Sequence, residues 1–138
     1  MTYGDDATIR DILTSAGEIW AVVGLSSNPD RAAYRVAEKL QRIDKKVVPV
    51  HPKAEAVHGE QGYASLADIP FPVDVVNVFV NSALAGDIAD QAVTIGAKAV
   101  WFQLGVVDVA AYDRTRGAGL RMVMDRSAGR EITRLGLA

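Results

Sequence analysis

Ile19-Trp-Ala-Val-Val-Gly-Leu-Ser-Ser-Asn-Pro-Asp-Arg31 carries the clearest structural signal in this chain. Its opening run, Ile19 to Val23, is apolar and rich in β-prone residues, which predicts a buried strand. Gly24 then begins a tight turn, and Asn28 and Pro29 are residue types that cap and open a helix. A buried strand that passes through a glycine turn into a helix is typical of the first half of a strand–helix–strand unit.

The alternation of short apolar runs and helical spacing continues along the rest of the chain. It predicts further strands at 46–50, 73–80, 99–102 and 120–124, and helices around 9–16, 33–40, 88–95 and 109–116. Gly17 is expected to end the first helix, and 125–138 shows no clear period. This pattern favours an α/β fold with three layers, in which a mostly parallel five-stranded sheet carries helices on both faces.

Composition indicates one compact domain spanning residues 1–138, because 49% of the residues are apolar and 23% are charged. The chain has no cysteine, which excludes disulfides and thiol nucleophiles and fits a cytoplasmic location. The amino terminus is polar and acidic, and no apolar run approaches about 18 residues, so we expect neither secretion nor a membrane partner. The net charge is −2 and residues 54–112 are acidic, which argues against a nucleic-acid partner.

Ligands of parallel α/β sheets bind at the carboxyl ends of the strands. After the first strand, the Gly24 turn and the helix start are expected to offer unpaired N–H groups that suit a phosphate, with hydroxyl donors from Ser26 and Ser27. The later glycines of a dinucleotide-binding turn are absent, so a plain strand-to-helix turn is the alternative.

The second strand ends in Val50-His51-Pro52-Lys53, where an NAD site would carry an acidic residue for the ribose diol. The cation of Lys53 predicts instead a phosphate on the adenosine ribose, as in coenzyme A or NADP, and Pro52 would fix the turn that aims it. His51 can hydrogen-bond a ligand if it faces the crevice. A solvated loop lysine is the alternative.

Two other features border the same edge of the predicted sheet. The connection 52–72 is long and holds three prolines, which is typical of a functional or a disordered loop. After the fourth strand, Gln103 can hydrogen-bond an amide of a ligand, and Gly105 lets a ligand approach the backbone. A strand end closed by a glycine turn is the alternative.

Several sequence blocks, in order along residues 8–137, resemble the small stand-alone CoA-binding proteins, which are related to the N-terminal CoA-binding domain of the succinyl-CoA synthetase alpha chain. The blocks include Gly24-Leu-Ser-Ser-Asn-Pro-Asp-Arg31, Val48-Pro-Val-His-Pro-Lys53, Gly96-Ala-Lys-Ala-Val-Trp-Phe-Gln-Leu-Gly105 and Met124-Asp-Arg126. The resemblance implies a Rossmann-like domain that binds coenzyme A or an acyl-CoA. By position, it implies cofactor contacts from Gly24, Ser26, Ser27, Asn28, Arg31, Pro52, Lys53, Phe79 and Val80.

The sequence departs from that family at three places. Ala32-Ala33 stands where Pro-Ser is frequent, and Val80 stands where an arginine is frequent, so two possible ligand contacts are missing. Ser127-Ala128-Gly129 stands where Cys-Pro-Lys is frequent, which removes any thiol chemistry with a bound CoA.

The sequence therefore predicts a binding protein for a small nucleotide ligand rather than an enzyme. No pair of groups is placed for acid–base catalysis, and the two histidines have no third ligand at metal-site spacing. One alternative is an NADP-binding oxidoreductase, with His51 as its proton donor. Another is a ligand-free interaction or homo-oligomerisation domain. The arginines at 126, 130 and 134 recur every four residues, which is more typical of a solvated or self-association face than of a second anion site.

Overall fold

The computed structural model describes residues 3–138, so the first two residues of the predicted domain lie outside the described residues. Five strands form one sheet in the order β2-β1-β3-β4-β5, and all neighbouring strands are parallel. The predicted Rossmann-like α/β fold is confirmed. The strands are β1 (Ile19–Val23), β2 (Lys46–Val50), β3 (Val75–Val78), β4 (Ala99–Phe102) and β5 (Arg121–Val123).

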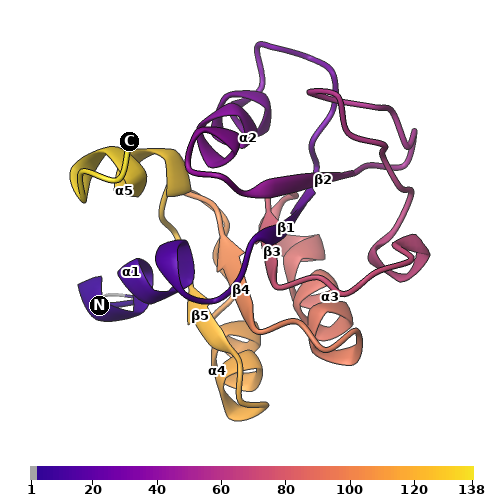
Figure 1. Cartoon of the computed structure of the whole chain (residues 1–138). Helices are drawn as coiled ribbons and strands as arrows, with labels where there is room; N and C mark the ends of the chain where they lie inside the picture. Colours follow the sequence, from indigo (N-terminus) through magenta and orange to yellow (C-terminus); the bar gives the residue numbers. More distant parts are fainter. Residues whose placement is uncertain (1–2) are drawn as a thin grey trace.

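Helices cover both faces of the sheet and complete the three layers (Figure 1). One face carries the first, second and last helices, and the other carries the third and fourth. Within residues 3–138, no helix is long and apolar enough to cross a membrane. The helices are α1 (Asp6–Thr14), α2 (Ala32–Arg42), α3 (Ser82–Thr94), α4 (Val109–Gly117) and α5 (Ala128–Arg134), with a 3-10 turn η1 (Leu66–Asp68).

The structure corrects several predicted boundaries. The strands β3 and β5 are shorter than the predicted 73–80 and 120–124, because inter-strand pairing stops before the apolar runs do. The helix α1 ends at Thr14, before Gly17, which adopts a φ of +136° in the turn into β1. The helix α5 was missed altogether, since its seven residues are too few to show a period.

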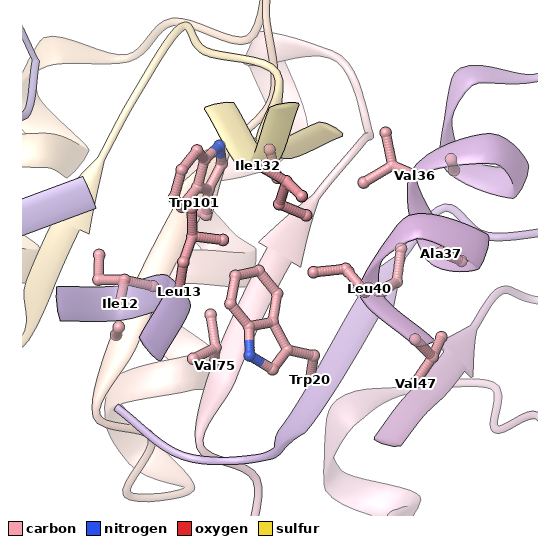
Figure 2. Close-up of a cluster of buried hydrophobic side chains, with 14 of the residues drawn as sticks. Ile12, Leu13, Trp20, Val36, Ala37, Leu40, Val47, Val75, Trp101 and Ile132 are labelled. Atoms are coloured by element: carbon pink, nitrogen blue, oxygen red, sulfur yellow. The ribbon is translucent and has the colours of Figure 1, made fainter. Parts of the chain in front are cut away.

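The face under α1, α2 and α5 is packed around two tryptophans from neighbouring parts of the sheet (Figure 2). Trp20 on β1 and Trp101 on β4 are fully buried, and their ring centroids lie 6.2 Å apart. Each of the three helices contributes a side chain to the cluster around these rings, namely Leu13, Leu40 and Ile132. Full burial of each such side chain stabilises the fold by about 1.5–3 kcal/mol. This packing holds α2 in a fixed position on the sheet, and therefore also the start of α2 relative to the strand ends.

The strand order creates a crevice position. The chain leaves β1 through α2 on one face of the sheet and leaves β3 through α3 on the opposite face, although β1 and β3 are neighbours. Crossovers that diverge from adjacent strands leave an opening at their carboxyl ends, where open α/β sheets bind ligands. The fold therefore has an opening at the place where the sequence predicts the ligand-binding site.

The long connection 52–72 is ordered along the edge of the sheet. Tyr63 forms a parallel bridge with Val50, through bonds from the N–H of His51 to the Tyr63 carbonyl (3.0 Å) and from the Tyr63 N–H to the Pro49 carbonyl (2.9 Å). Leu66 is buried with the side chains under α3. The connection thus covers the exposed edge of β2 and supplies one wall beside the crevice.

Asn77, on β3, is a buried polar residue whose burial costs free energy. It is fully buried, and within residues 3–138 neither its amide nitrogen nor its amide oxygen has a hydrogen-bond partner. A leucine of similar size would remove two unpaired polar atoms, so we expect Asn77→Leu to raise the free energy of unfolding by about 1–3 kcal/mol. Urea denaturation measures the change.

The control for this variant is Asn81→Leu, because Asn81 is exposed and its side chain makes no capping hydrogen bond. We expect a change within about 0.5 kcal/mol there. A loss of stability in Asn77→Leu would contradict the prediction, since it would mean that the amide is satisfied in solution.

Candidate functional site

A cavity of about 680 Å³ opens at the carboxyl edge of the sheet, at the divergence of α2 and α3. Its walls come from the ends of β1, β2, β3 and β4, from the start of α2, from the 52–72 connection and from α3. Its volume falls in the range of small-molecule sites. Of the residues predicted from the sequence, those that line it are Gly24, Ser26, Arg31, His51, Pro52, Phe79, Val80 and Gln103.

Gly24 sets the floor of the cavity. Its φ of +100° is one that side-chain-bearing residues rarely adopt, and its N–H donates to the Val50 carbonyl at 2.8 Å. A Cβ on Gly24 would lie 3.2 Å from the Cβ of Phe79, closer than carbon atoms normally pack. The turn after β1 is therefore pinned between the ends of β2 and β3, which keeps the opening clear.

The turn between Gly24 and α2 differs from the prediction. Asn28 does not cap the helix and Pro29 does not open it, because an extra turn comes first, closed by a bond from the Arg31 N–H to the Asn28 carbonyl (3.2 Å). The Asn28 side chain instead accepts from the Asp30 N–H at 3.0 Å. Arg31 occupies the N-cap position without a side-chain capping bond.

The result is a set of unpaired backbone donors around the mouth of the cavity. Within residues 3–138, the N–H groups of Ser26, Ser27, Ala32 and Ala33 have no hydrogen-bond acceptor. Free N–H groups at a helix start, together with the positive end of the helix dipole, attract anions. Arg31 adds an exposed guanidinium at the same place.

The second strand end forms a tight turn beside these donors. His51 accepts from the Ala54 N–H through its carbonyl (2.7 Å) and from the Lys53 N–H through Nδ1 (3.2 Å). His51 and Pro52 line the cavity, whereas Lys53 is exposed one residue further on and is not part of the lining. The structure thus places the Lys53 cation outside the cavity wall, on the turn at its rim.

Ser27 and Asn28 are exposed and also lie outside the cavity lining. The Ser27 hydroxyl donates to Oε2 of Glu55 at 3.0 Å, which ties the turn after β1 to the long connection. Sequence reasoning missed Glu55, because nothing in the sequence pairs residues so far apart. It also missed the cavity walls formed by Leu66 and Ile88, whose apolar character resembles that of any core position.

The end of β4 brings an unpaired acceptor to the cavity wall. Gln103 is only 9% exposed, and within the described part of the chain its Oε1 has no hydrogen-bond donor. A buried oxygen on a cavity wall favours a ligand with an N–H group. Gly105 lies outside the lining, with φ of +86° and its N–H bonded to the Asp125 carboxylate at 2.7 Å, so it shapes the turn after β4.

The cavity holds little that could perform acid–base chemistry. His51 is its only imidazole within residues 3–138, because the Nε2 of His58 lies 2.9 Å from the Tyr34 carbonyl and its ring packs on that of Tyr34. Across the same residues, no three His, Asp or Glu side chains gather as a metal site would need. The arrangement can hold an anion at the start of α2 and an N–H donor at Gln103, between apolar walls.

Comparison with known proteins gives consistent relatives. A family model described as a CoA binding domain matches residues 18–133. An uncharacterized protein of Bacillus subtilis, YneT, is 34% identical over 86% of this chain and 87% of its own length. A hypothetical protein from Pyrococcus horikoshii has a solved structure with a TM-score of 0.89 and 39% identity, covering 96% of this chain and 92% of the other.

A larger relative contains the same region. The alpha subunit of an ADP-forming acetate–CoA ligase II of Pyrococcus furiosus is 29% identical over 73% of this chain. The match spans 21% of that subunit, about a fifth of its length.

Gly24 supplies the test of the cavity's construction. Gly24→Ala would place a methyl group against Phe79 in a backbone conformation that alanine resists, so we expect a loss of about 1–3 kcal/mol in the free energy of unfolding. Gly117→Ala is the control, because Gly117 lies in α4 with open space around it and no positive φ. That variant should gain up to about 1 kcal/mol. Equal stabilities of the two variants in chemical denaturation would contradict the account of the turn.

Proposed function

We propose that this chain, which belongs to the CoA-binding domain family, binds coenzyme A or an acyl-CoA in the cavity at the carboxyl edge of its sheet. The observation that carries the proposal is that one cavity joins an anion-attracting turn after β1, the rim turn after β2 and a buried unpaired acceptor after β4. Coenzyme A has a diphosphate, a ribose phosphate and an arm with amide N–H groups, which are the three matching partners.

The diphosphate is proposed to lie on the turn between Gly24 and α2. Its oxygens would accept from the unpaired N–H groups near Ser26 and at the helix start, with Arg31 as the countercharge. Negative charge is more stable there than elsewhere on the cavity wall, because the amide dipoles are already oriented by the fold.

The adenosine end is proposed to lie between the rim turn and the apolar wall. His51 and Pro52 line the cavity after β2, and Leu66 and Ile88 add apolar lining from η1 and α3. Lys53, exposed at the rim, would meet the ribose phosphate from outside the wall. A solvated lysine costs little to bring to a phosphate, so its contribution is one of charge.

The arm of coenzyme A is proposed to pass Gln103. The buried Oε1 of Gln103 would accept an amide N–H of the arm, which would satisfy the unpaired oxygen. The residues present therefore fit the cofactor at three separate points.

We propose further that the chain holds this ligand without chemical turnover, as a binding protein in the cytoplasm. Within residues 3–138, the cavity pairs no acid with a base. The ligase activity of the larger relative belongs to a protein of which this chain matches 21%. An NADP-dependent oxidoreductase is the second candidate. Lys53 suits the ribose phosphate of NADP equally well, and His51 offers one proton donor in the cavity.

Binding of coenzyme A and its variants tests the assignment of Lys53. In calorimetric titrations, we expect coenzyme A to bind about tenfold more tightly than dephospho-CoA, because only the former carries the ribose phosphate. Lys53→Gln should erase this preference and leave dephospho-CoA binding unchanged.

The control is Lys46→Gln, because Lys46 is an exposed lysine at the opposite end of the same strand. It should leave both affinities unchanged. Binding of NADP in preference to coenzyme A would favour the oxidoreductase. If none of these nucleotides binds, the proposed function is overturned.

A further inference from the structure

A second hollow, of about 740 Å³, lies between α2 and α5. Ala32, Gln103 and Leu104 line both this hollow and the first cavity, so the two meet at the end of β4. A ligand held in the first cavity can therefore continue past Gln103 into the second.

Positive charge dominates the second hollow, which we call the basic groove. Among the residues that the structure describes, its lining holds one carboxylate, Glu38, and four cations, Arg35, Lys39, Arg42 and Arg130. Arg42 is the cation that Glu38 approaches, at 3.9 Å. No salt bridge within residues 3–138 involves the other three cations.

Two of the three cations without a salt bridge are oriented by hydrogen bonds to uncharged acceptors. Arg35 donates to the carbonyls of Pro29 (3.4 Å) and Asp30 (3.3 Å), and Lys39 donates to the carbonyl of Gly129 (2.9 Å). Carbonyl acceptors orient these side chains but leave a full positive charge on each. Arg130 is exposed, and within the described chain its guanidinium has no hydrogen-bond partner. The groove is therefore prepared for an anion.

We propose that the basic groove receives the acyl end of a coenzyme A thioester whose acyl group carries a carboxylate. This inference rests on the proposed function, because the nucleotide must occupy the first cavity. The buried, unpaired Oε1 of Gln103 would hold an amide of the arm at the junction. Leu104, 47% exposed at the same place, would cover the methylene groups of the arm.

A neutral acyl group fits this groove poorly. It would displace water from Arg35, Lys39 and Arg130 and give no charge in return, so their desolvation would count against binding. A terminal carboxylate replaces the lost water with charge-assisted hydrogen bonds. The groove thus discriminates between acyl groups of equal length by their charge.

Succinyl-CoA and butyryl-CoA are the matched probes, because both carry four-carbon acyl groups and differ at the end, in a carboxylate against a methyl. In calorimetric titration of the full chain, we expect succinyl-CoA to bind about tenfold more tightly than butyryl-CoA. Arg130→Gln should reduce the ratio to within about threefold. Coenzyme A itself should bind equally to the wild-type chain and the variant, since Arg130 lies outside the first cavity.

Arg10→Gln is the matched control, because Arg10 is an exposed arginine on α1 outside both hollows, and it should keep the tenfold ratio. A ratio near one in the wild-type chain, with coenzyme A bound, would overturn this inference and leave the proposed function standing. Binding of no CoA compound would overturn both.

Two other outcomes would also overturn the inference. One is a tenfold ratio that survives in both Arg130→Gln and the double variant Lys39→Gln/Arg130→Gln, provided that thermal unfolding shows the latter to be folded. The other is free succinate binding as tightly as succinyl-CoA, which would make the groove an independent anion site.

Discussion

The hydrogen bonds that join the ends of neighbouring strands give the candidate site its shape. The Gly24 N–H bonds the last carbonyl of β2 (2.8 Å), the Phe79 N–H bonds the last carbonyl of β1 (2.9 Å), and the Gln103 N–H bonds the last carbonyl of β3 (3.1 Å). Each bond extends the pairing by one residue beyond the strand. Because four strand ends are thereby held at one level, the turns that follow them face a common cavity, and the ligand would meet a rigid edge rather than separate loops.

Much of the fold could be predicted from the sequence. The strands β1, β2 and β4 have the bounds that their apolar runs predict, because strands buried on both faces leave an uninterrupted hydrophobic signal. The helix α5 has no such signal, and its position depends on contacts with α2 that lie about 90 residues away in the chain, such as the bond from Lys39 to the Gly129 carbonyl. Periodicity reports local burial and carries no information on such pairs.

The candidate site also contains residues that the sequence could place and residues that it could not. Residues directly after the strands, such as Gly24, His51 and Gln103, could be placed from the sequence because the carboxyl ends of parallel strands share one edge. The start of α2 could not, since Asn28 satisfies the usual pattern for a cap and yet serves a turn that precedes the helix. The cap residue is decided by where packing of α2 on the sheet fixes the first helical turn, which local preference does not determine. Glu55 reaches the site for a similar reason, from a loop ordered by the edge of β2.

Gly129 shows how one departure from the family pattern can reshape a binding surface. A Cβ built there would lie 3.4 Å from both Cδ of Lys39 and Cγ2 of Val36, which is van der Waals contact, so a longer side chain would extend along the surface of α2. The Gly129 carbonyl accepts a hydrogen bond from the Lys39 ammonium at 2.9 Å, which joins α5 to α2. The basic groove lies between these two helices. A lysine at this position would begin in contact with Lys39 and would share the space between the two helices with it. Loss of the family's lysine thus need not remove positive charge from this end of the molecule, because the Lys39 ammonium of α2 already reaches Gly129 on α5.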